Sequence, residues 1–107
     1  FSEVYVPHAY AGIVPLVPML KEPIYTLLEK EYGERVIGVE QEFRSAPIKR
    51  SIARHLDMRA GAAGLVVVRH YFGAGERLLL VTVSTYNPDR YSYKMRLRFN
   101  PLPSGGA

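Results

Sequence analysis

Two apolar runs joined by a glycine-containing turn constrain the fold of this 107-residue chain more than any other feature. Residues 65–72 form a β-branched and aromatic run, and residues 77–86 form a second one. The four residues between them, 73–76, include two glycines, a pattern typical of a β-hairpin. Because a sheet with one apolar face cannot stand alone in water, the rest of the chain must cover this hairpin.

A third strand is predicted directly after the hairpin, over residues 91–99. Residues 87–89 contain a proline and break the preceding run. Apolar side chains then alternate with polar and cationic ones, namely Tyr91, Tyr93, Met95, Leu97 and Phe99 against Ser92, Lys94, Arg96 and Arg98. This period of two predicts one buried face and one solvated, cationic face.

The residues before the hairpin contain the segments that are candidates for packing on its apolar face. Residues 1–6 predict a strand that ends at Pro7. The prolines within residues 8–20 predict an irregular, largely buried segment with at most a short helical turn. A helix is predicted to begin at Pro23 and to end at Gly33, because proline favours the first helical position and glycine the C-terminal cap.

A further strand and a second helix follow. Residues 36–44 alternate and predict a strand, and a helix is predicted to begin at Pro47. The buried face of that helix is predicted to consist of Ile48, Ile52, Ala53 and Leu56. The order of strand, loop, helix, strand, helix and three strands predicts an α+β domain with a mostly antiparallel sheet and helices packed on it.

The charge of the chain does not by itself indicate a partner. The sequence has 14 Lys and Arg against 10 Asp and Glu, a net charge of +4. The basic residues are spread along the chain and interleaved with acidic ones, which is more typical of a solvated surface than of a nucleic-acid interface. No apolar run approaches the roughly 18 residues of a membrane-spanning helix, so no membrane partner is expected.

The cysteine and histidine content and the lack of catalytic motifs argue against a catalytic or metal site. The absence of Cys excludes disulfides and thiolate metal ligands, and it fits a cytoplasmic location. The three histidines, His8, His55 and His70, have no partner at metal-ligand spacing, so neither a metal nor another cofactor is expected. No nucleophile elbow, catalytic triad or phosphate-binding glycine loop is present, and we expect no enzyme activity.

An internal similarity suggests that the domain is partial. The pattern Tyr-x-Pro-x-x-Tyr occurs twice, at Tyr5, Pro7 and Tyr10 and again at Tyr86, Pro88 and Tyr91. If the two copies belong to related halves, the first strand ends a half-domain whose earlier part lies outside this chain. Such an arrangement leaves a sheet edge open unless another segment covers it.

Seven short segments together resemble one known family. They are, in order, Val4-Tyr-Val-Pro7, Glu22-Pro-Ile-Tyr25, Leu28-Glu-Lys-Glu-Tyr-Gly33, Val39-Glu-Gln-Glu-Phe43, Ala53-Arg-His-Leu56, Val68-Arg-His-Tyr-Phe72 and Ser84-Thr-Tyr-Asn-Pro-Asp-Arg-Tyr91. Their joint order and spacing resemble the effector-binding UTRA domain of GntR-type bacterial transcriptional regulators, in the histidine-utilisation-repressor subfamily. No single segment is specific, but together they cover nearly the whole chain.

The resemblance implies a chorismate-lyase-like fold with its first half truncated. The expected domain covers residues 1–100, and residues 101–107 are expected to form a flexible tail. The resemblance also implies a pocket for a small, anionic effector, such as a carboxylate, and a homodimer. Operator DNA would be bound only through a separate winged helix-turn-helix domain, which nothing in this sequence resembles.

The same resemblance nominates two effector-binding tyrosines. Tyr86, at the end of the long strand, and Tyr25, near the start of the first helix, match effector-contacting tyrosines of the family. Two departures from the family pattern bear on the effector. Pro23 stands where relatives often have a serine, which weakens phosphate binding there, and Leu80 stands where binders of amino-sugar phosphates carry an acidic residue.

Three further candidates come from the strands. Arg69 is the one charge in an otherwise apolar strand, so it either pairs with a carboxylate, for which Glu42 is nominated, or faces a ligand anion. Ser84 lies two residues before Tyr86, hence on the same strand face, and is a candidate ligand hydrogen-bonding group. Two alternatives to a sensing domain stay open: a small lyase-like enzyme using Arg69 and Glu42, and a truncated fragment that self-associates without a working pocket.

Overall fold

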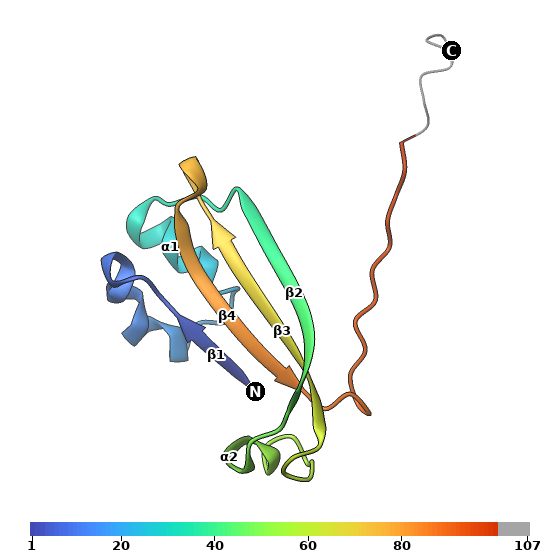
Figure 1. Ribbon diagram of the computed structural model, residues 1–107. Coiled ribbons are helices and arrows are strands. Elements are labelled where there is room, and N and C mark those ends of the chain that lie inside the picture. The colour runs from blue at the N-terminus through green and yellow to red at the C-terminus, as the bar shows by residue number, and fades with distance from the viewer. Residues whose placement is uncertain (101–107) are drawn as a thin grey trace, which may run out of the picture.

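The computed structural model describes residues 1–100, so the predicted flexible tail at 101–107 lies outside the described residues. Four antiparallel strands form one sheet in the order β1-β4-β3-β2 (Figure 1). The strands are β1 (Ser2–Tyr5), β2 (Gly38–Pro47), β3 (Ala63–Phe72) and β4 (Leu78–Tyr86). The predicted α+β class and the predicted hairpin, formed by β3 and β4, are confirmed.

The hairpin turn and the register follow from local chemistry. The short 3₁₀ turn η2 (Ala74–Glu76) joins β3 to β4, and its Gly75 has φ +65°, which favours glycine. The pairing shifts at the bulge between Tyr71 and Phe72. Leu79, next to this bulge, is fully buried.

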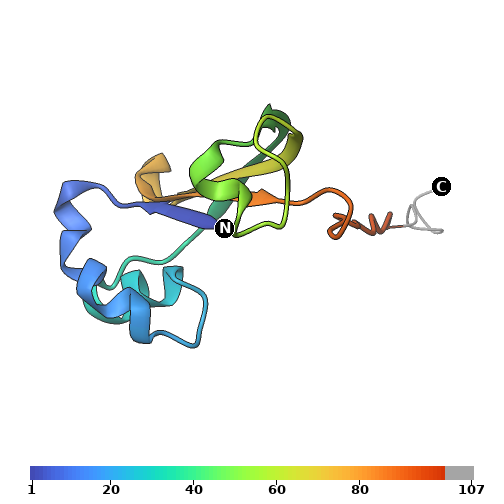
Figure 2. The same cartoon turned by 90° about the horizontal axis from the view of Figure 1, so that it is seen from below.

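Helical segments cover the two faces of the sheet at different places (Figure 2). The 3₁₀ helix η1 (His8–Met19) and the helix α1 (Tyr25–Tyr32) lie together on one face. The short helix α2 (Arg50–Ala53) lies on the opposite face. The α1 side holds the main core, made of Tyr10, Ile13, Leu27, Leu28, Leu79 and Leu80.

The end of α1 at Gly33 agrees with the sequence prediction, and its start at Tyr25 lies two residues after the predicted Pro23. Its first turn bonds to Pro23, because the Thr26 N–H donates to the Pro23 carbonyl at 3.0 Å. Gly33 adopts φ +67° at the other end, and the Glu34 N–H returns to the Leu28 carbonyl at 3.1 Å. A glycine in the left-handed conformation is a common C-terminal cap, because it lets the chain turn away from the helix.

The prediction for residues 8–20 was wrong in both conformation and burial. They form 3₁₀ turns from His8 to Met19 (η1), interrupted by a kink at Tyr10, which has φ −112° and ψ 16°. Only Tyr10 and Ile13 of this segment are buried, and both belong to the main core. The remaining side chains of η1 therefore face outward or lie at the rim.

The second helix also begins later than predicted. Pro47 is the last residue of β2, paired with Ala63, and α2 begins only at Arg50. Of the predicted buried face, Ile48 and Ala53 are buried, whereas Ile52 and Leu56 are only half-buried. A Cβ at Gly64 would overlap the side chain of Ile48, so glycine at this position permits close packing.

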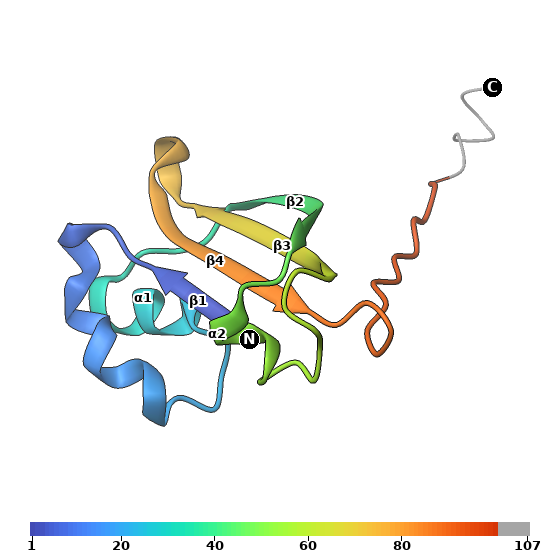
Figure 3. The same cartoon turned by 60° about the horizontal axis from the view of Figure 1, so that its bottom comes forward.

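The predicted third strand over residues 91–99 is not part of this sheet. Tyr91 and Tyr93 still contact the body, through the rings of Tyr86 and Phe43, but the segment that follows β4 runs away from the sheet (Figures 1 and 3). The side chains of Met95, Leu97 and Phe99 are 57%, 69% and 86% exposed. The physical reason is topological, because β4 already has β1 on one side and β3 on the other. A strand that follows β4 therefore finds free edges only at β1 and β2.

Among residues 1–100, no helix has both the length and the apolar character needed to cross a membrane.

Candidate functional site

A pocket of about 200 Å³ lies between the start of α1 and the β1–β4–β3 face of the sheet. Three of the predicted site residues, Tyr25, Arg69 and Ser84, line it together. The other lining residues are Ser2, Val4, Pro23, Ile24, Tyr71, Leu80 and Thr82. The pocket thus combines apolar walls with a few polar groups, which is typical of a small-ligand site.

Strand alternation and register bring the polar groups to one face. Successive side chains of a strand point to opposite faces, so Leu80, Thr82 and Ser84 share one side of β4. Thr82 lies opposite Arg69 on β3, and Ser84 lies opposite Ser2 on β1. Three strands therefore contribute polar side chains to the same small area.

Arg69 supplies the only formal charge of the pocket lining. Its side chain is half-buried, and its Nε donates to Oε1 of Gln41 at 2.7 Å. No carboxylate of residues 1–100 lies within ion-pair distance of its guanidinium. A half-buried guanidinium that is held by a neutral amide keeps its positive charge and has further N–H donors for an anion.

The hydroxyl groups beside Arg69 are only partly satisfied. Ser2 Oγ and Ser84 Oγ form a hydrogen bond of 2.9 Å across β1 and β4. Thr82 Oγ1 is buried and has no hydrogen-bond partner. A buried hydroxyl without a partner costs about 1–3 kcal/mol, so a polar ligand group that reaches Thr82 would gain a favourable contact.

Aromatic rings form the wall of the pocket near α1. The rings of Tyr25 and Tyr71 are 6.0 Å apart and tilted by 31°. Tyr86 lies two residues beyond Ser84 on the same strand face, but it does not line this pocket. Its ring instead stacks on Tyr91 at 3.9 Å with an interplanar angle of 6°.

Of the stacked tyrosines, Tyr91 lies within the electrostatic reach of Arg69. The pKa of the Tyr91 phenol is raised, chiefly because packing removes it from water and also through its neighbour Tyr86. The positive charge of Arg69 partly offsets this rise in pKa. Tyr86 and Tyr91 therefore border the polar area without entering the pocket lining.

The expected pairing between Arg69 and Glu42 does not form. Gln41, not Glu42, lies directly opposite Arg69 in the register of β2 and β3. Glu42 is exposed, and its carboxylate lies 3.6 Å from the guanidinium of Arg44. Because neighbouring residues of a strand face opposite sides, a partner one position away from Gln41 points to the wrong face.

Sequence reasoning missed four polar or aromatic residues of this area: Ser2, Gln41, Tyr71 and Thr82. The alternation that nominated Ser84 also places Thr82 on the same face, so this signal was present in β4. Ser2 and Gln41 depend on which strands are neighbours and in what register. That information is not contained in the periodicity of any single strand.

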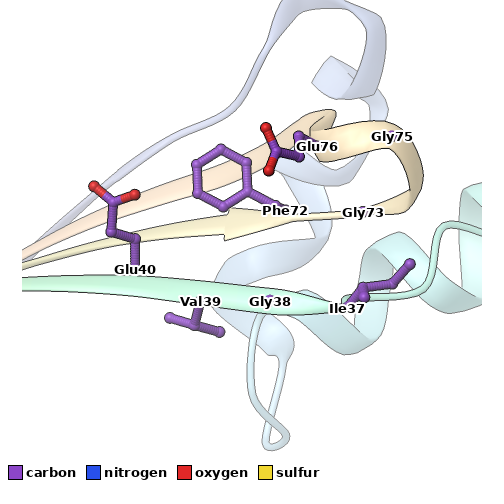
Figure 4. Close-up of a pocket in the computed structure, with 8 residues that line it drawn as sticks. All are labelled: Ile37, Gly38, Val39, Glu40, Phe72, Gly73, Gly75 and Glu76. Carbon is purple, nitrogen blue, oxygen red and sulfur yellow. The ribbon is translucent and has the colours of Figure 1, made fainter.

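A second, larger hollow of about 590 Å³ lies at the start of β2, beside the hairpin end of β3 and η2. Figure 4 shows Phe72 between the carboxylates of Glu40 and Glu76, with Gly38, Gly73 and Gly75 in the backbone around them. Its two charged side chains are both acidic and exposed. This hollow offers an anion no cationic partner, so the smaller pocket is the better candidate for an anionic effector.

Comparison with known proteins identifies the family and the fold. The profile of the UTRA domain matches residues 1–92. No curated protein matches the chain. A ligand-binding domain of a GntR-family transcriptional regulator from Bordetella bronchiseptica is 26% identical, with a TM-score of 0.75 over 91% of this chain and 64% of that one.

Two further solved structures have the same fold. A transcriptional regulator from Streptomyces coelicolor is 25% identical, with a TM-score of 0.76 over 94% of this chain and 65% of that one. The effector-binding domain of the Bacillus subtilis trehalose repressor is 20% identical, with a TM-score of 0.70 over 94% of this chain and 69% of that one. This chain thus spans about two thirds of the length of these structures. Since the family profile covers residues 1–92 and the fold agrees with these domains, the chain belongs to the UTRA domain family.

Proposed function

We propose that this chain is a ligand-sensing domain of a GntR-type transcriptional regulator, and that its effector is a small anion bound in the pocket at Arg69. The observation that carries the proposal is the un-neutralised guanidinium of Arg69, held by Gln41 at 2.7 Å beside the unpartnered hydroxyl of Thr82. Family membership and the solved ligand-binding relatives support a sensing role.

Each wall of the pocket has a defined part in this proposal. Arg69 neutralises the anionic group, while Ser84 and Thr82 donate or accept hydrogen bonds with neighbouring polar atoms. Tyr25 and Tyr71 enclose the apolar part of the ligand. Glu42 has no part, because it lies on the other face of the sheet.

The regulatory consequence is a shift between conformations. Three strands and α1 meet at the pocket, so a bound ligand stabilises their present arrangement over alternatives. In a homodimer with DNA-binding domains attached, such a shift would change the spacing of those domains and hence operator binding. The pocket lining contains no carboxylate to act as a general acid, so nothing in this site favours a lyase-like reaction.

A thermal-shift screen of the chain tests the proposal. The probes are small carboxylates, sugar phosphates, phosphonates and amino acids, applied to the wild type and to two variants, Arg69→Gln and Arg44→Gln. The second variant removes an exposed arginine from the same sheet without touching the pocket. Far-UV circular dichroism confirms that both variants fold.

We expect at least one anion to raise the melting temperature of the wild type and of Arg44→Gln. At a hundred times its dissociation constant, a ligand stabilises the fold by about 2.7 kcal/mol, a shift of several degrees or more. Loss of the guanidinium in Arg69→Gln should remove about 1.5–3 kcal/mol of ligand binding, roughly ten- to a hundredfold in affinity. No anion-dependent shift in the wild type, or an equal shift in Arg69→Gln, would contradict the proposal.

A further inference from the structure

One buried hydroxyl in the pocket at Arg69 has no partner. Among residues 1–100, Thr82 Oγ1 is the one buried side-chain polar atom that forms no hydrogen bond. Since a buried hydroxyl left unpaired destabilises a fold, this position favours a polar group that comes from a ligand. We propose that Thr82 selects the effector, which is a small carboxylate with a neutral hydroxyl or carbonyl group close to its carboxylate. This assignment of the ligand class rests on the function proposed above.

The neighbouring polar side chains do not supply the missing partner. Ser84, two residues further along β4 on the same face, is buried and forms a hydrogen bond of 2.9 Å with Ser2 of β1. Arg69, directly opposite Thr82 on β3, directs its Nε to Gln41 of β2. Thr82 therefore lies between side chains that already have partners of their own.

Thr82 is within reach of a ligand although its hydroxyl oxygen is covered. The residue as a whole is half-buried and belongs to the pocket lining. A rotation of about 120° about χ1 exchanges the positions of Oγ1 and Cγ2 between staggered rotamers. Such a rotation turns the hydroxyl toward a ligand, to which it can donate one hydrogen bond and from which it can accept others.

The strand register limits the distance between the two polar groups of the ligand. Side chains directly opposite each other on neighbouring strands have Cβ atoms about 4.5–5.5 Å apart. Thr82 and Arg69 are such a pair, so one small molecule can contact both. A hydroxyl or carbonyl on one of the first carbons after the carboxylate can meet Thr82 while the carboxylate binds the guanidinium.

The charge of the lining favours a carboxylate over a phosphate monoester. Arg69 is the only charged side chain of this lining in the part of the chain that the structure describes, and one guanidinium matches one carboxylate in a planar, bidentate geometry. A phosphate monoester carries a charge of about −1.5 to −2 at neutral pH, which a single cation neutralises only in part. Pro23, which lines the pocket just before α1, also has no backbone N–H for a phosphate oxygen.

The same lining favours a neutral second group over an ammonium group. An ammonium group at Thr82 would lie near the positive charge of Arg69, and the described lining has no carboxylate to compensate it. Two cations in a half-buried site repel each other, whereas a hydroxyl or a carbonyl adds no charge. The pocket is therefore expected to prefer a hydroxy or oxo acid to the corresponding amino acid.

Ligands that differ in one group test this selectivity. The probes are 3-methylbutanoate, its 2-hydroxy and 3-hydroxy derivatives, and free valine, each titrated into the full chain by calorimetry. They are small because a volume of about 200 Å³ corresponds to roughly seven water molecules.

Two variants with the same chemical change separate the pocket from the rest of β4. Thr82→Val removes the unpaired hydroxyl and keeps the shape of the side chain. Thr85→Val, the control, makes this change at a buried threonine of β4 whose side chain points to the other face of the sheet. Thr82→Ser keeps a hydroxyl at the pocket position.

We expect one of the two hydroxy acids to bind the wild type about tenfold or more tightly than 3-methylbutanoate, because only a hydroxylated ligand satisfies Thr82. Thr82→Val should abolish this preference and leave the affinity for 3-methylbutanoate unchanged, whereas Thr85→Val and Thr82→Ser should keep the preference. Without ligand, Thr82→Val should melt several degrees higher than the wild type, since the unpaired hydroxyl is gone.

The possible outcomes distinguish the selectivity of Thr82 from the anion site itself. Equal affinity of the wild type for 3-methylbutanoate and both hydroxy acids, or a preference that survives in Thr82→Val, would overturn the role of Thr82 while the anion site stands. Tighter binding of valine than of either hydroxy acid would also overturn it. If none of the four acids binds the wild type, the proposed function fails, and the assigned ligand class fails with it.

Discussion

At the scale of single residues, the site depends on a neutral partner for Arg69. Gln41 holds the guanidinium at 2.7 Å without neutralising it, and this leaves the charge available to a ligand. The sequence identified Arg69 as unusual because it is the one charge in an apolar strand. It could not identify the partner, because a shift of one residue in register exchanges Gln41 for Glu42.

Gln41→Glu tests this residue-level account. The new carboxylate would lie opposite Arg69 and form an ion pair, so an anionic effector would have to displace it. We expect anion affinity to fall about tenfold or more, which corresponds to roughly 1.4 kcal/mol, while the fold stays intact. Isothermal titration with the strongest anion from the thermal-shift screen measures the loss. Glu42→Gln, on the other face, is the matched control and should leave the affinity unchanged.

Gly33 gives a second prediction at this scale. Its φ of +67° is in the left-handed region, where a Cβ is strained, although open space surrounds the position. We expect Gly33→Ala to lower the free energy of unfolding by about 1–2 kcal/mol in urea denaturation. Gly38→Ala is the control, because the same methyl group also meets open space but the backbone has no positive φ. Equal effects of the two substitutions would show that strain at Gly33 is not the cause.

At the scale of elements, the sequence pattern predicted the elements that form from neighbouring residues. The apolar runs of β3 and β4 with the glycine turn between them identified the hairpin, and Pro23 with the Gly33 cap identified α1. It failed for η1, where the proline-containing segment forms 3₁₀ turns on either side of a kink at Tyr10 and buries only Tyr10 and Ile13. It also placed residues 91–99 in the sheet, because a pattern shows that a segment can be a strand but not whether an edge is free for it.

The contact between α1 and the sheet carries a prediction of its own. Leu28 is fully buried in the core that joins α1 to β4. Leu28→Ala should lower the free energy of unfolding by about 2–5 kcal/mol and should also weaken the effector response, since Tyr25 on the same helix lines the pocket. Leu16→Ala, at a 39% exposed position of η1, should lower the free energy of unfolding clearly less. Thermal melts of both variants measure the two losses. Similar losses for both would contradict the assigned core.

At the scale of the whole molecule, the order β1-β4-β3-β2 decides which side chains meet at the site. Placing β4 between β1 and β3 collects Ser2, Thr82, Ser84 and Arg69 on one face. The same order leaves β2 at an edge and directs the segment after β4 away from its own sheet. The α+β class followed from the sequence, whereas strand order and register depend on contacts between distant segments.

The effector site that we propose is the pocket at Arg69 and not the larger hollow at the start of β2. Two-dimensional NMR of the ¹⁵N-labelled chain, titrated with the strongest anion from the screen, tests it most directly. We expect amide shift changes to cluster at Ser2, Tyr25, Arg69, Thr82 and Ser84. A cluster centred on Ile37–Glu40 and Gly73–Glu76 would place the ligand in the other hollow and contradict the account.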